Sequence, residues 1–398
     1  MKTKMFLLLA CVSFVTCLSA LAVDRINITE PPYNAIPNDG IPDTAAINAA
    51  VAAGTSIYFP PGTYNFTGRI TLPNKAYRLY GDGPGVSTIL FTGPTAGIYS
   101  SNLGANTLNV EGLTLEAITA AAGTAISATF SPGANAKFHT ATIHNVEIRG
   151  SDRTISASGY WTRGIYLFQA PNSFIDKIAI TGNSGSTTTG IQWSSAVGSA
   201  TTGLFITNAE IQWCNSAIST AGWVEGFYMS GFEVVLCGTP AGTPALNFLS
   251  TAPSQSPAFT LINGHVDMLG DGVKMQNLSA IKVSHVDFEH VNGTADGTYL
   301  SLTACIGAII TDCTFTSASN VFNNENGVFL TSTDQARVSG NIFRGLDPKA
   351  GGTGSPIVAY TGSKTVRISG NIFKSCQNSF DNYIGSQAYY DTDNVIVP

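Results

Sequence analysis

Two short patterns of hydrophobic and polar positions repeat along most of the chain. The first has the order apolar-x-x-apolar-x-apolar, where x is mostly polar. Its copies are the segments 110–115, 143–148, 175–180, 206–211, 229–234, 283–288 and 310–315. Two further copies, 338–343 and 368–373, have Asn341 and Asn371 at a position that is otherwise apolar, and one copy near 266–268 fits only with a one-residue insertion.

The second pattern, small-apolar-x-apolar, lies between copies of the first. It begins at positions 26 to 29 residues apart, from Ile165 to Ile357. Alternation of this kind predicts short strands whose apolar side chains point inward and whose x side chains point outward. A unit of this length cannot bury a core alone, so successive units must stack. The two patterns together predict a parallel β-solenoid of about ten coils with strands ~4.8 Å apart.

The segment before the repeats has a different pattern. Residues 42–54 are rich in Ala and place Ile47 and Val51 on one helical face, with Asp43 or Thr44 at the start and Gly54 at the end. Because the end of a solenoid exposes unpaired strand edges, we expect this helix to cap the N-terminal end.

Composition narrows the class of protein. Of the 398 residues, 11% are charged and 44% are hydrophobic, and the net charge is −6 with only 19 Lys and Arg. This composition excludes long disorder and argues against a nucleic-acid-binding protein, which carries a basic patch. Little charge and abundant glycine (41 residues) favour strands and turns, and therefore an all-β fold.

The first 22 residues have the features of a secretory signal. Lys2 and Lys4 precede an apolar run, and small residues surround a predicted cleavage after Ala22. No later stretch is long enough to span a membrane. The sequence therefore predicts a secreted or periplasmic protein with one domain over residues 23–398. Cys214 and Cys237 occupy the same place in successive coils, so we consider a disulfide and two stacked thiols as alternatives.

Three motifs resemble a known superfamily. They are N-D-G-I-P-D-T-A-A-I-N-A-A from Asn38, I-Y-F-P-P-G-T-Y from Ile57 and L-Y-G-D-G-P-G-V-S-T-I-L from Leu79. They are similar to the opening segment of the pectate-lyase-like superfamily of right-handed parallel β-helices. The resemblance covers about residues 33–91, the N-terminal cap and first coils, and the repeats of 106–398 extend it. It implies a polysaccharide ligand, and homotrimers occur among similar proteins, but it does not specify a reaction.

One outward position per coil predicts a column of acidic side chains. The x between the last two apolar positions reads Glu147, Ala179, Glu210, Glu233, Asp267, Asp287 and Thr314 in successive copies. Carboxylates on neighbouring strands would be ~5 Å apart and those on alternate strands ~10 Å apart. Retaining glycosidases hold their acid pair ~5 Å apart and inverting ones ~6.5–9.5 Å apart, so the sequence leaves the stereochemistry open. We therefore predict catalytic residues among Asp267, Asp287, Asp271, Glu233 and Glu210.

Other side chains near this column are candidates for substrate binding. His265, His285, Glu289 and Lys274 flank the acidic residues and would position the substrate or shift the pKa values of the acids. Three aromatic residues, Trp213, Trp223 and Tyr228, are candidates for stacking on sugar rings. Each of these residues also has a purely structural interpretation, as a solvated or turn side chain.

The sequence leaves three functions open. The favoured one is a glycoside hydrolase that uses Asp267 and Asp287 and requires no cofactor. The second is a polysaccharide lyase that uses His285 or Lys274 as base and Ca²⁺ on the acidic column. The third is a non-catalytic glycan-binding or structural solenoid. No cysteine or histidine spacing predicts a dedicated metal site.

Overall fold

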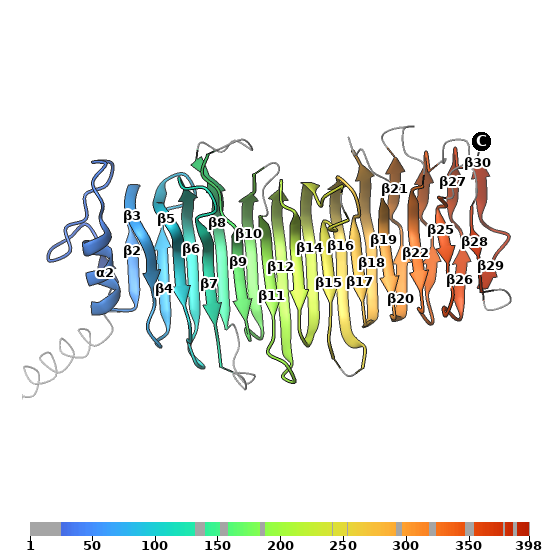
Figure 1. Cartoon of the computed structure of the whole chain (residues 1–398), viewed down its shortest axis with the longest axis horizontal. Helices are drawn as coiled ribbons and strands as arrows, with labels where there is room; N and C mark the ends of the chain where they lie inside the picture. The colour runs from blue at the N-terminus through green and yellow to red at the C-terminus, as the bar shows by residue number, and fades with distance from the viewer. Residues whose placement is uncertain are drawn as a thin grey trace, which may run out of the picture.

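The chain folds as a three-faced parallel β-helix. The computed structural model describes residues 25–397 except 132–139, 152–157, 184–187, 241, 253, 292–296, 318–323, 347–353, 377–378 and 385–387. Its coils stack along one axis, from α2 (Thr44–Ala53) at the N-terminal end to β30 (Val395–Val397) at the other end (Figure 1). The predicted signal segment 1–22 lies outside the described residues.

We call the three outer surfaces face 1, face 2 and face 3, in the order in which each coil forms them. The strands of each face pair in parallel with those of the neighbouring coils. Face 1 consists of β1 (Arg25–Asn27), β2 (Ser56–Phe59), β4 (Tyr77–Gly81), the first halves of β6 (Leu108–Ala117), β8 (Ala141–Gly150), β10 (Ser173–Thr181), β12 (Thr201–Gln212), β14 (Val224–Cys237), β16 (Ser256–Met268) and β18 (Leu278–His290), and then β20 (Ile306–Thr311), β23 (Arg337–Ser339), β26 (Val366–Ser369) and β29 (Ala388–Tyr390).

Faces 2 and 3 complete each coil. Face 2 consists of the first parts of β3 (Gly62–Thr71) and β5 (Ser87–Ser100), the second halves of the strands that bend out of face 1, and β21 (Thr314–Ser317), β24 (Ile342–Arg344), β27 (Ile372–Lys374) and β30. Face 3 consists of the last parts of β3 and β5, and β7 (Gly123–Thr129), β9 (Arg163–Phe168), β11 (Thr189–Ser194), β13 (Ser216–Ala221), β15 (Leu246–Leu249), β17 (Val273–Gln276), β19 (Thr298–Thr303), β22 (Asn326–Thr331), β25 (Ile357–Ala359) and β28 (Asp381–Asn382).

This architecture confirms the prediction of a parallel β-helix. The apolar positions of both repeat patterns form one continuous buried core inside the coils. Identical aromatic positions stack from coil to coil, as in the ring ladder of Phe288, Phe315, Phe343 and Phe373, whose centroids are 4.9, 4.7 and 5.2 Å apart. Each coil buries its apolar side chains against its neighbours, which is why the repeat must be stacked to be stable.

The corner between face 1 and face 2 is made by one residue of positive φ in each coil. In most coils this residue is Gly, Asn or Asp, the types that tolerate the left-handed region. The column is Gly112, Asn145, Lys177, Asn208, Gly231, Asn263, His285, Asp312, Gly340 and Gly370. His285 therefore occupies a corner with φ 54°. The corner residues of other coils include Gly, Asn, Lys and Asp, so this position requires a positive φ and no particular side chain.

The predicted N-terminal cap is present. In α2, the side chains of Ile47 and Val51 are buried, and the hydroxyl of Tyr77 donates to the carbonyl of Val51 at 3.3 Å. Asp43 precedes the helix, but its carboxylate accepts from the backbone N–H groups of Ile36 and Asn65 rather than from the helix. The acid therefore ties the cap to β3 of the first coil.

Asn341 and Asn371 explain the two polar residues at normally apolar positions. Both are fully buried and belong to a ladder just after the corner. The Oδ1 atom of Asn371 accepts from the backbone N–H and from the Nδ2 group of Asn341, both at 3.0 Å. Asn394 accepts in the same way from Asn371. The ladder satisfies buried amide groups where the coil turns.

Removing one rung of this ladder should destabilise the C-terminal coils. We expect Asn371→Ala to lower the free energy of unfolding by about 1–3 kcal/mol, because Asn341 loses a buried acceptor. Denaturant unfolding followed by circular dichroism measures the change. Asn247→Ala is the matched control, since Asn247 points outward from β15, and should change stability by less than about 0.5 kcal/mol. Equal effects of the two substitutions would contradict this role.

A second buried polar cluster lies where β18 ends. His290 is fully buried, and its Nδ1 atom is 2.7 Å from Oε1 of Glu325, which is 5% exposed. The Tyr299 hydroxyl donates to the same Oε1 atom at 3.2 Å and to the carbonyl of Thr316 at 3.0 Å. Burial, followed by the nearby Glu325 carboxylate, raises the pKa of Tyr299. The phenol therefore stays protonated and serves as a donor.

The structure contradicts a disulfide between Cys214 and Cys237. Both are buried free thiols, and the backbone N–H of Cys214 donates to Sγ of Cys237 at 3.4 Å. Contact with Cys237 and then burial raise the pKa of Cys214. Of the two alternatives from the sequence, the stacked thiols are correct, and both act as small apolar core residues.

Among the described residues, no helix is both long enough and apolar enough to cross a membrane.

Candidate functional site

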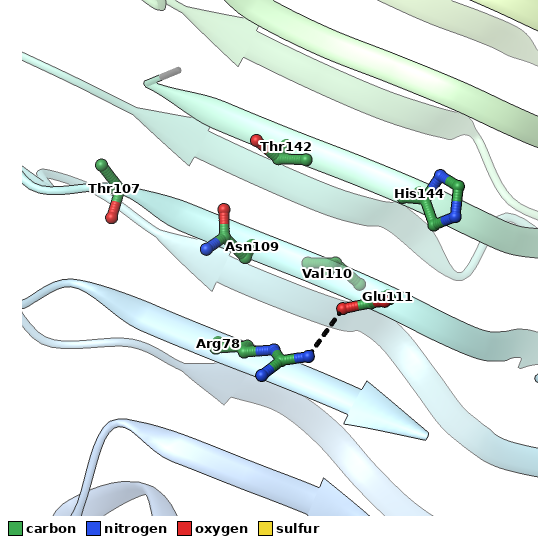
Figure 2. A pocket seen from close by; sticks show the side chains of 7 residues that line it. All are labelled: Arg78, Thr107, Asn109, Val110, Glu111, Thr142 and His144. Atoms are coloured by element: carbon green, nitrogen blue, oxygen red, sulfur yellow. Dashed lines mark hydrogen bonds and ion pairs between the residues drawn. The ribbon is translucent and has the colours of Figure 1, made fainter. Parts of the chain in front are cut away.

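Two shallow grooves of about 550 Å³ each lie on different faces of the β-helix. One is on face 1 and is lined by residues of β4, β6 and β8, including Arg78, Glu111 and His144 (Figure 2). The other is on face 2 and is lined by the acidic column and the adjacent corner. The sequence predicted chemistry only on the second of these surfaces.

The pairing register of face 2 defines the acidic column. Glu210 lies opposite Glu233, Glu233 opposite His265, and His265 opposite Asp287. Glu210, Glu233 and Asp287 thus occupy the predicted column. Asp267 does not, because His265 takes its place.

Asp267 belongs to the next outward column, where it lies opposite Glu289 on β18. The reason is Gly264, which stands at a position that is apolar in the other copies. A Cβ atom at 264 would overlap the ring of Phe232 in the preceding coil, so only glycine fits there. Without a large apolar residue at 264, the sequence pattern took Val266 and Met268 as the last two apolar positions, whereas the pairing register places Gly264 and Val266 there, two residues earlier.

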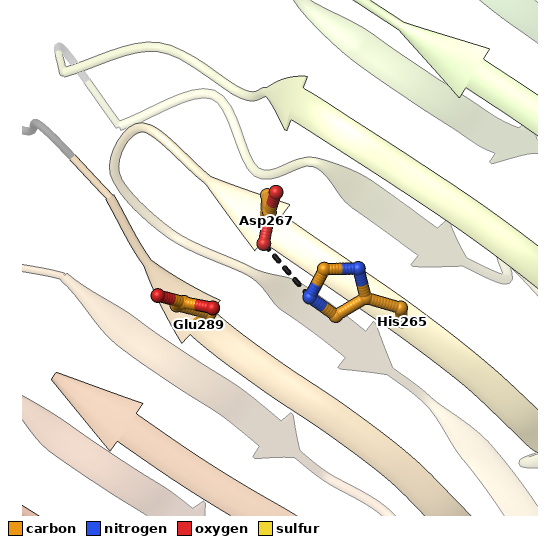
Figure 3. Close-up of side chains that lie close together, drawn as sticks. All are labelled: His265, Asp267 and Glu289. Carbon is orange, nitrogen blue, oxygen red and sulfur yellow. Dashed lines mark ion pairs between the residues drawn. The ribbon is translucent and has the colours of Figure 1, made fainter. Parts of the chain in front are cut away.

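The shift of Asp267 creates a compact cluster instead of a single file of acids. Nε2 of His265 lies 2.9 Å from Oδ1 of Asp267, and its Nδ1 lies 4.0 Å from Oε1 of Glu233. One side-chain ligand atom from each of His265, Asp267 and Glu289 lies within 4.8 Å of the others (Figure 3). All three side chains are partly buried, whereas Glu233 is largely exposed. We call these three residues the His265 cluster.

The His265 cluster carries excess negative charge around one imidazole. Contact with the Asp267 carboxylate raises the pKa of His265, burial of the ring opposes this, and the charges of Glu233 and Glu289 add to the increase. The imidazolium and the Asp267 carboxylate therefore stabilise each other as an ion pair. An imidazole nitrogen with two carboxylates is also a ligand set that can hold a divalent transition metal.

The elevated pKa of His265 can be measured directly. In a proton NMR titration we expect its imidazole to titrate above the ordinary value of about 6.5 and to return toward that value in Asp267→Asn. Because the folded-state pKa is raised, the stabilisation is fully present below the unfolded-state pKa and is lost as the pH rises through the folded-state pKa. Glu210→Gln is the control, because Glu210 is not among the groups that raise this pKa. A titration that is unchanged by Asp267→Asn would contradict the ion pair.

Several predicted site residues lie elsewhere. Lys274 is on β17 in face 3, opposite Asn247 and Ser301. Asp271 lies in the turn after β16, where its Oδ1 atom accepts from the backbone N–H of Thr298 at 2.9 Å. Asp271 therefore connects successive coils, and the structure does not bring Lys274 or Asp271 to the groove on face 2.

The predicted aromatic residues also lie outside this groove. Trp213 has a positive φ of 56° just after β12. The indole N–H of Trp223 donates to Glu225 at 2.5 Å, so the polar edge of the Trp223 ring is already hydrogen-bonded. Tyr228 points from face 1, with its ring centroid 6.4 Å from that of Phe205. None of the three lines the groove on face 2.

His285 and Glu289 do lie close to the predicted acids. His285 lines the groove from the corner, next to Asp287 and His265. Glu289 lies in the His265 cluster, deeper toward face 3. The structure therefore brings together Glu210, Glu233, His265, Asp287 and His285 in the groove and joins Asp267 and Glu289 to its edge.

Comparisons with known proteins agree on the fold. Residues 26–242 match the family model described as rhamnogalacturonase A/epimerase, pectate lyase-like. This match includes the groove on face 1 and ends before the His265 cluster. A search of curated protein sequences found no match.

Solved structures extend the likeness over nearly the whole chain. The A-module of the mannuronan C-5 epimerase AlgE6 from Azotobacter vinelandii superposes with a TM-score of 0.60 at 16% identity, over 94% of this chain and 99% of that module. The surface adhesin PfbA of Streptococcus pneumoniae gives a TM-score of 0.52 at 13% identity, over 93% of this chain and 91% of the adhesin. At these identities the similarity concerns the fold, and it includes both an enzyme and an adhesin.

Proposed function

Because the chain belongs to the rhamnogalacturonase A/epimerase, pectate lyase-like family, we propose that it is a secreted enzyme that cleaves a polysaccharide by glycoside hydrolysis. The observation that carries the proposal is the pair Asp267 and Glu289 on neighbouring strands, with carboxylate oxygens within 4.8 Å of each other. Retaining glycosidases hold their two carboxyl groups ~5–5.5 Å apart. The catalytic pair is thus Asp267 and Glu289 instead of Asp267 and Asp287.

The surroundings assign different roles to the two carboxyl groups. The Asp267 carboxylate is oriented by Nε2 of His265 at 2.9 Å and acts as the nucleophile. Glu289 makes no ion pair within 4.0 Å among the described residues and acts as the proton donor. His265 is a positioning residue, because it orients the Asp267 carboxylate.

The reaction proceeds in two balanced steps. Glu289 protonates the glycosidic oxygen as its bond to the anomeric carbon breaks, and the Asp267 carboxylate bonds to that carbon. Water then attacks the same carbon and loses its proton to the Glu289 carboxylate, which releases Asp267. The groove beside the cluster, lined by Glu210, Glu233 and Asp287, would hold the sugars on one side of the scissile bond.

A lyase acting on uronic-acid polymers is the second candidate. One observation favours it: the described strands of face 3 from β7 to β25 contain no Asp or Glu but carry Arg163 and Lys274. A face without carboxylates suits a polyanionic chain. Elimination there would use Lys274 as base, and a bound Ca²⁺ would neutralise the uronate carboxylate. The ligand set found among the described residues, the His265 cluster, lies on another face.

An assay of residues 23–398 on a polysaccharide panel, with and without Ca²⁺, distinguishes these functions. We expect new reducing ends without the ultraviolet absorbance of unsaturated uronides, and no requirement for Ca²⁺. Absorbance that rises with the reducing ends, is dependent on Ca²⁺ and is lost in Lys274→Ala would establish the lyase instead. Binding without any cleavage across the panel would favour the non-catalytic solenoid.

A further inference from the structure

The groove on face 1 is separate from the proposed catalytic cluster. It crosses three neighbouring strands, with Arg78 on β4, Asn109 and Glu111 on β6, and Thr142 and His144 on β8 (Figure 2). Arg78 lies opposite Asn109, and Asn109 opposite Thr142. The Asp267 and Glu289 side chains point from face 2, several coils farther along the stack, so the two sites cannot contact the same sugar unit.

The charge of Arg78 is neutralised within the groove. Its Nη2 atom lies 3.0 Å from Oε2 of Glu111, and its guanidinium lies 4.3 Å from the centre of the Tyr80 ring. Contact with the carboxylate and the ring orients the planar guanidinium, whose remaining N–H groups are available as donors. A ligand therefore meets a fixed donor and acceptor pair instead of a free cation.

A second pair adjoins the first, because His144 on β8 lies opposite Glu111 on β6. Nδ1 of His144 lies 3.0 Å from Oδ2 of Asp176 on the next strand. Thr207 and Asn208 donate to the other oxygen of Asp176 at 2.6 and 2.8 Å. Burial of Asp176 opposes ionisation, but these two hydrogen bonds and His144 lower the pKa of Asp176 overall. Asp176 thus remains ionised and holds the His144 ring in place.

Neutral polar side chains lie beside the row of Glu111, His144 and Asp176, which are opposite one another on successive strands. Thr107, Asn109 and Thr142 line the groove, and their side chains make no hydrogen bond with any other residue that the structure describes. Two hydroxyls and one amide offer both donors and acceptors. This surface has hydrogen-bonding capacity that the fold itself does not use.

We propose that the groove on face 1 is a second, non-catalytic binding site for a neutral oligosaccharide. Mixed donors and acceptors, with the charge of Arg78 balanced by Glu111, match a ligand rich in hydroxyl groups. A uronate or phosphate would instead meet the Glu111 carboxylate, which lines the groove, and the further negative charge of Asp176 next to His144, which is unfavourable. The site would hold a polysaccharide chain at a distance from the cleavage site, and it does not depend on the proposed hydrolysis.

Calorimetric titration with neutral hexasaccharides tests this site. The probes are cellohexaose, mannohexaose and xylohexaose, with trigalacturonate as the anionic counterpart, and the protein is residues 23–398 carrying Glu289→Gln so that cleavage does not interfere. In this background, the double substitution Asn109→Ala with Thr142→Val should weaken the Kd for the neutral probe at least tenfold. Thr260→Val is the matched control: Thr260 points from face 1 at the position equivalent to Thr142, and Thr260→Val should leave the Kd unchanged.

A spectroscopic readout keeps the test valid if the double variant is unstable. The imidazole signals of His144 should shift on addition of the neutral hexasaccharide, and those of the fully buried His290 should not. The proposal is overturned if no neutral probe binds, if trigalacturonate binds more tightly than all neutral probes, or if binding leaves His144 and the double variant unaffected. If the wild-type chain cleaves no polysaccharide, the proposed hydrolase is disproved, but the expected binding to the groove on face 1 is unchanged.

Discussion

Glu289→Gln is expected to reduce the rate of polysaccharide cleavage by about 10²–10⁴-fold, because the substitution removes the proton donor while preserving the size of the side chain. Asp267→Asn should cause a loss of similar size, since the anomeric carbon then has no nucleophile. Initial rates of reducing-end formation measure both effects. Circular dichroism should show an unchanged β-helix, because Asp267 and Glu289 point outward from β16 and β18.

The two carboxyl groups can be distinguished by chemical rescue. Azide added to Asp267→Ala should restore turnover and produce a glycosyl azide of inverted configuration, because azide takes the place of the missing nucleophile. Asp312→Asn is the control for loss of one surface charge nearby: Asp312 is the corner residue of the following coil, where asparagine is also tolerated. The assignment is refuted if Glu289→Gln and Asp312→Asn retain equal activity.

Glu325→Ala is expected to cause the largest loss of stability. The substitution removes the acceptor shared by His290 and Tyr299 in a fully buried site. Removing a buried carboxylate from a hydrogen-bonded pair costs about 3–5 kcal/mol, because the remaining polar groups stay buried. Denaturant unfolding measures the loss, and hydrogen exchange should locate it in β18, β19 and β22, where the three residues lie or adjoin.

A conservative variant separates the charge of Glu325 from its packing. Glu325→Gln preserves the volume and one acceptor oxygen, so we expect a smaller loss than in Glu325→Ala. Asp334→Ala, in the following part of the same coil, serves as a control at a partly exposed carboxylate. Equal stability of Glu325→Ala and Asp334→Ala would show that the buried cluster does not stabilise the coils.

The sequence predicts the fold well because each sequence repeat corresponds to one coil. Each apolar position recurs at every turn and packs against the same position of the next coil, so periodicity alone determines the stacking and the inward face. The cap is equally predictable, since Ile47 and Val51 form an apolar stripe on an otherwise small helix. The buried pair of His290 and Glu325 cannot be predicted from the repeat, because Glu325 lies in a connection between repeats.

The site was predicted only in part, for two physical reasons. The column of Glu210, Glu233 and Asp287 follows from the repeat, whereas Asp267 was misplaced because Gly264 replaces an apolar residue. The groove on face 1 was missed although the same repeat contains it. The x directly after the first apolar position reads Glu111, His144 and Asp176 in three successive copies, and these side chains lie next to one another in the structure.

The contact between Phe232 and Gly264 has a consequence for how the family can vary. The two residues are 32 positions apart, yet the ring of one occupies the room that a side chain of the other would need. The combined volume of the two side chains is therefore limited, and a larger residue at 264 is compatible only with a smaller one at 232. In an alignment of close relatives, these two positions should covary, with bulk exchanged from one coil to the next while the acids on the surface above stay in place.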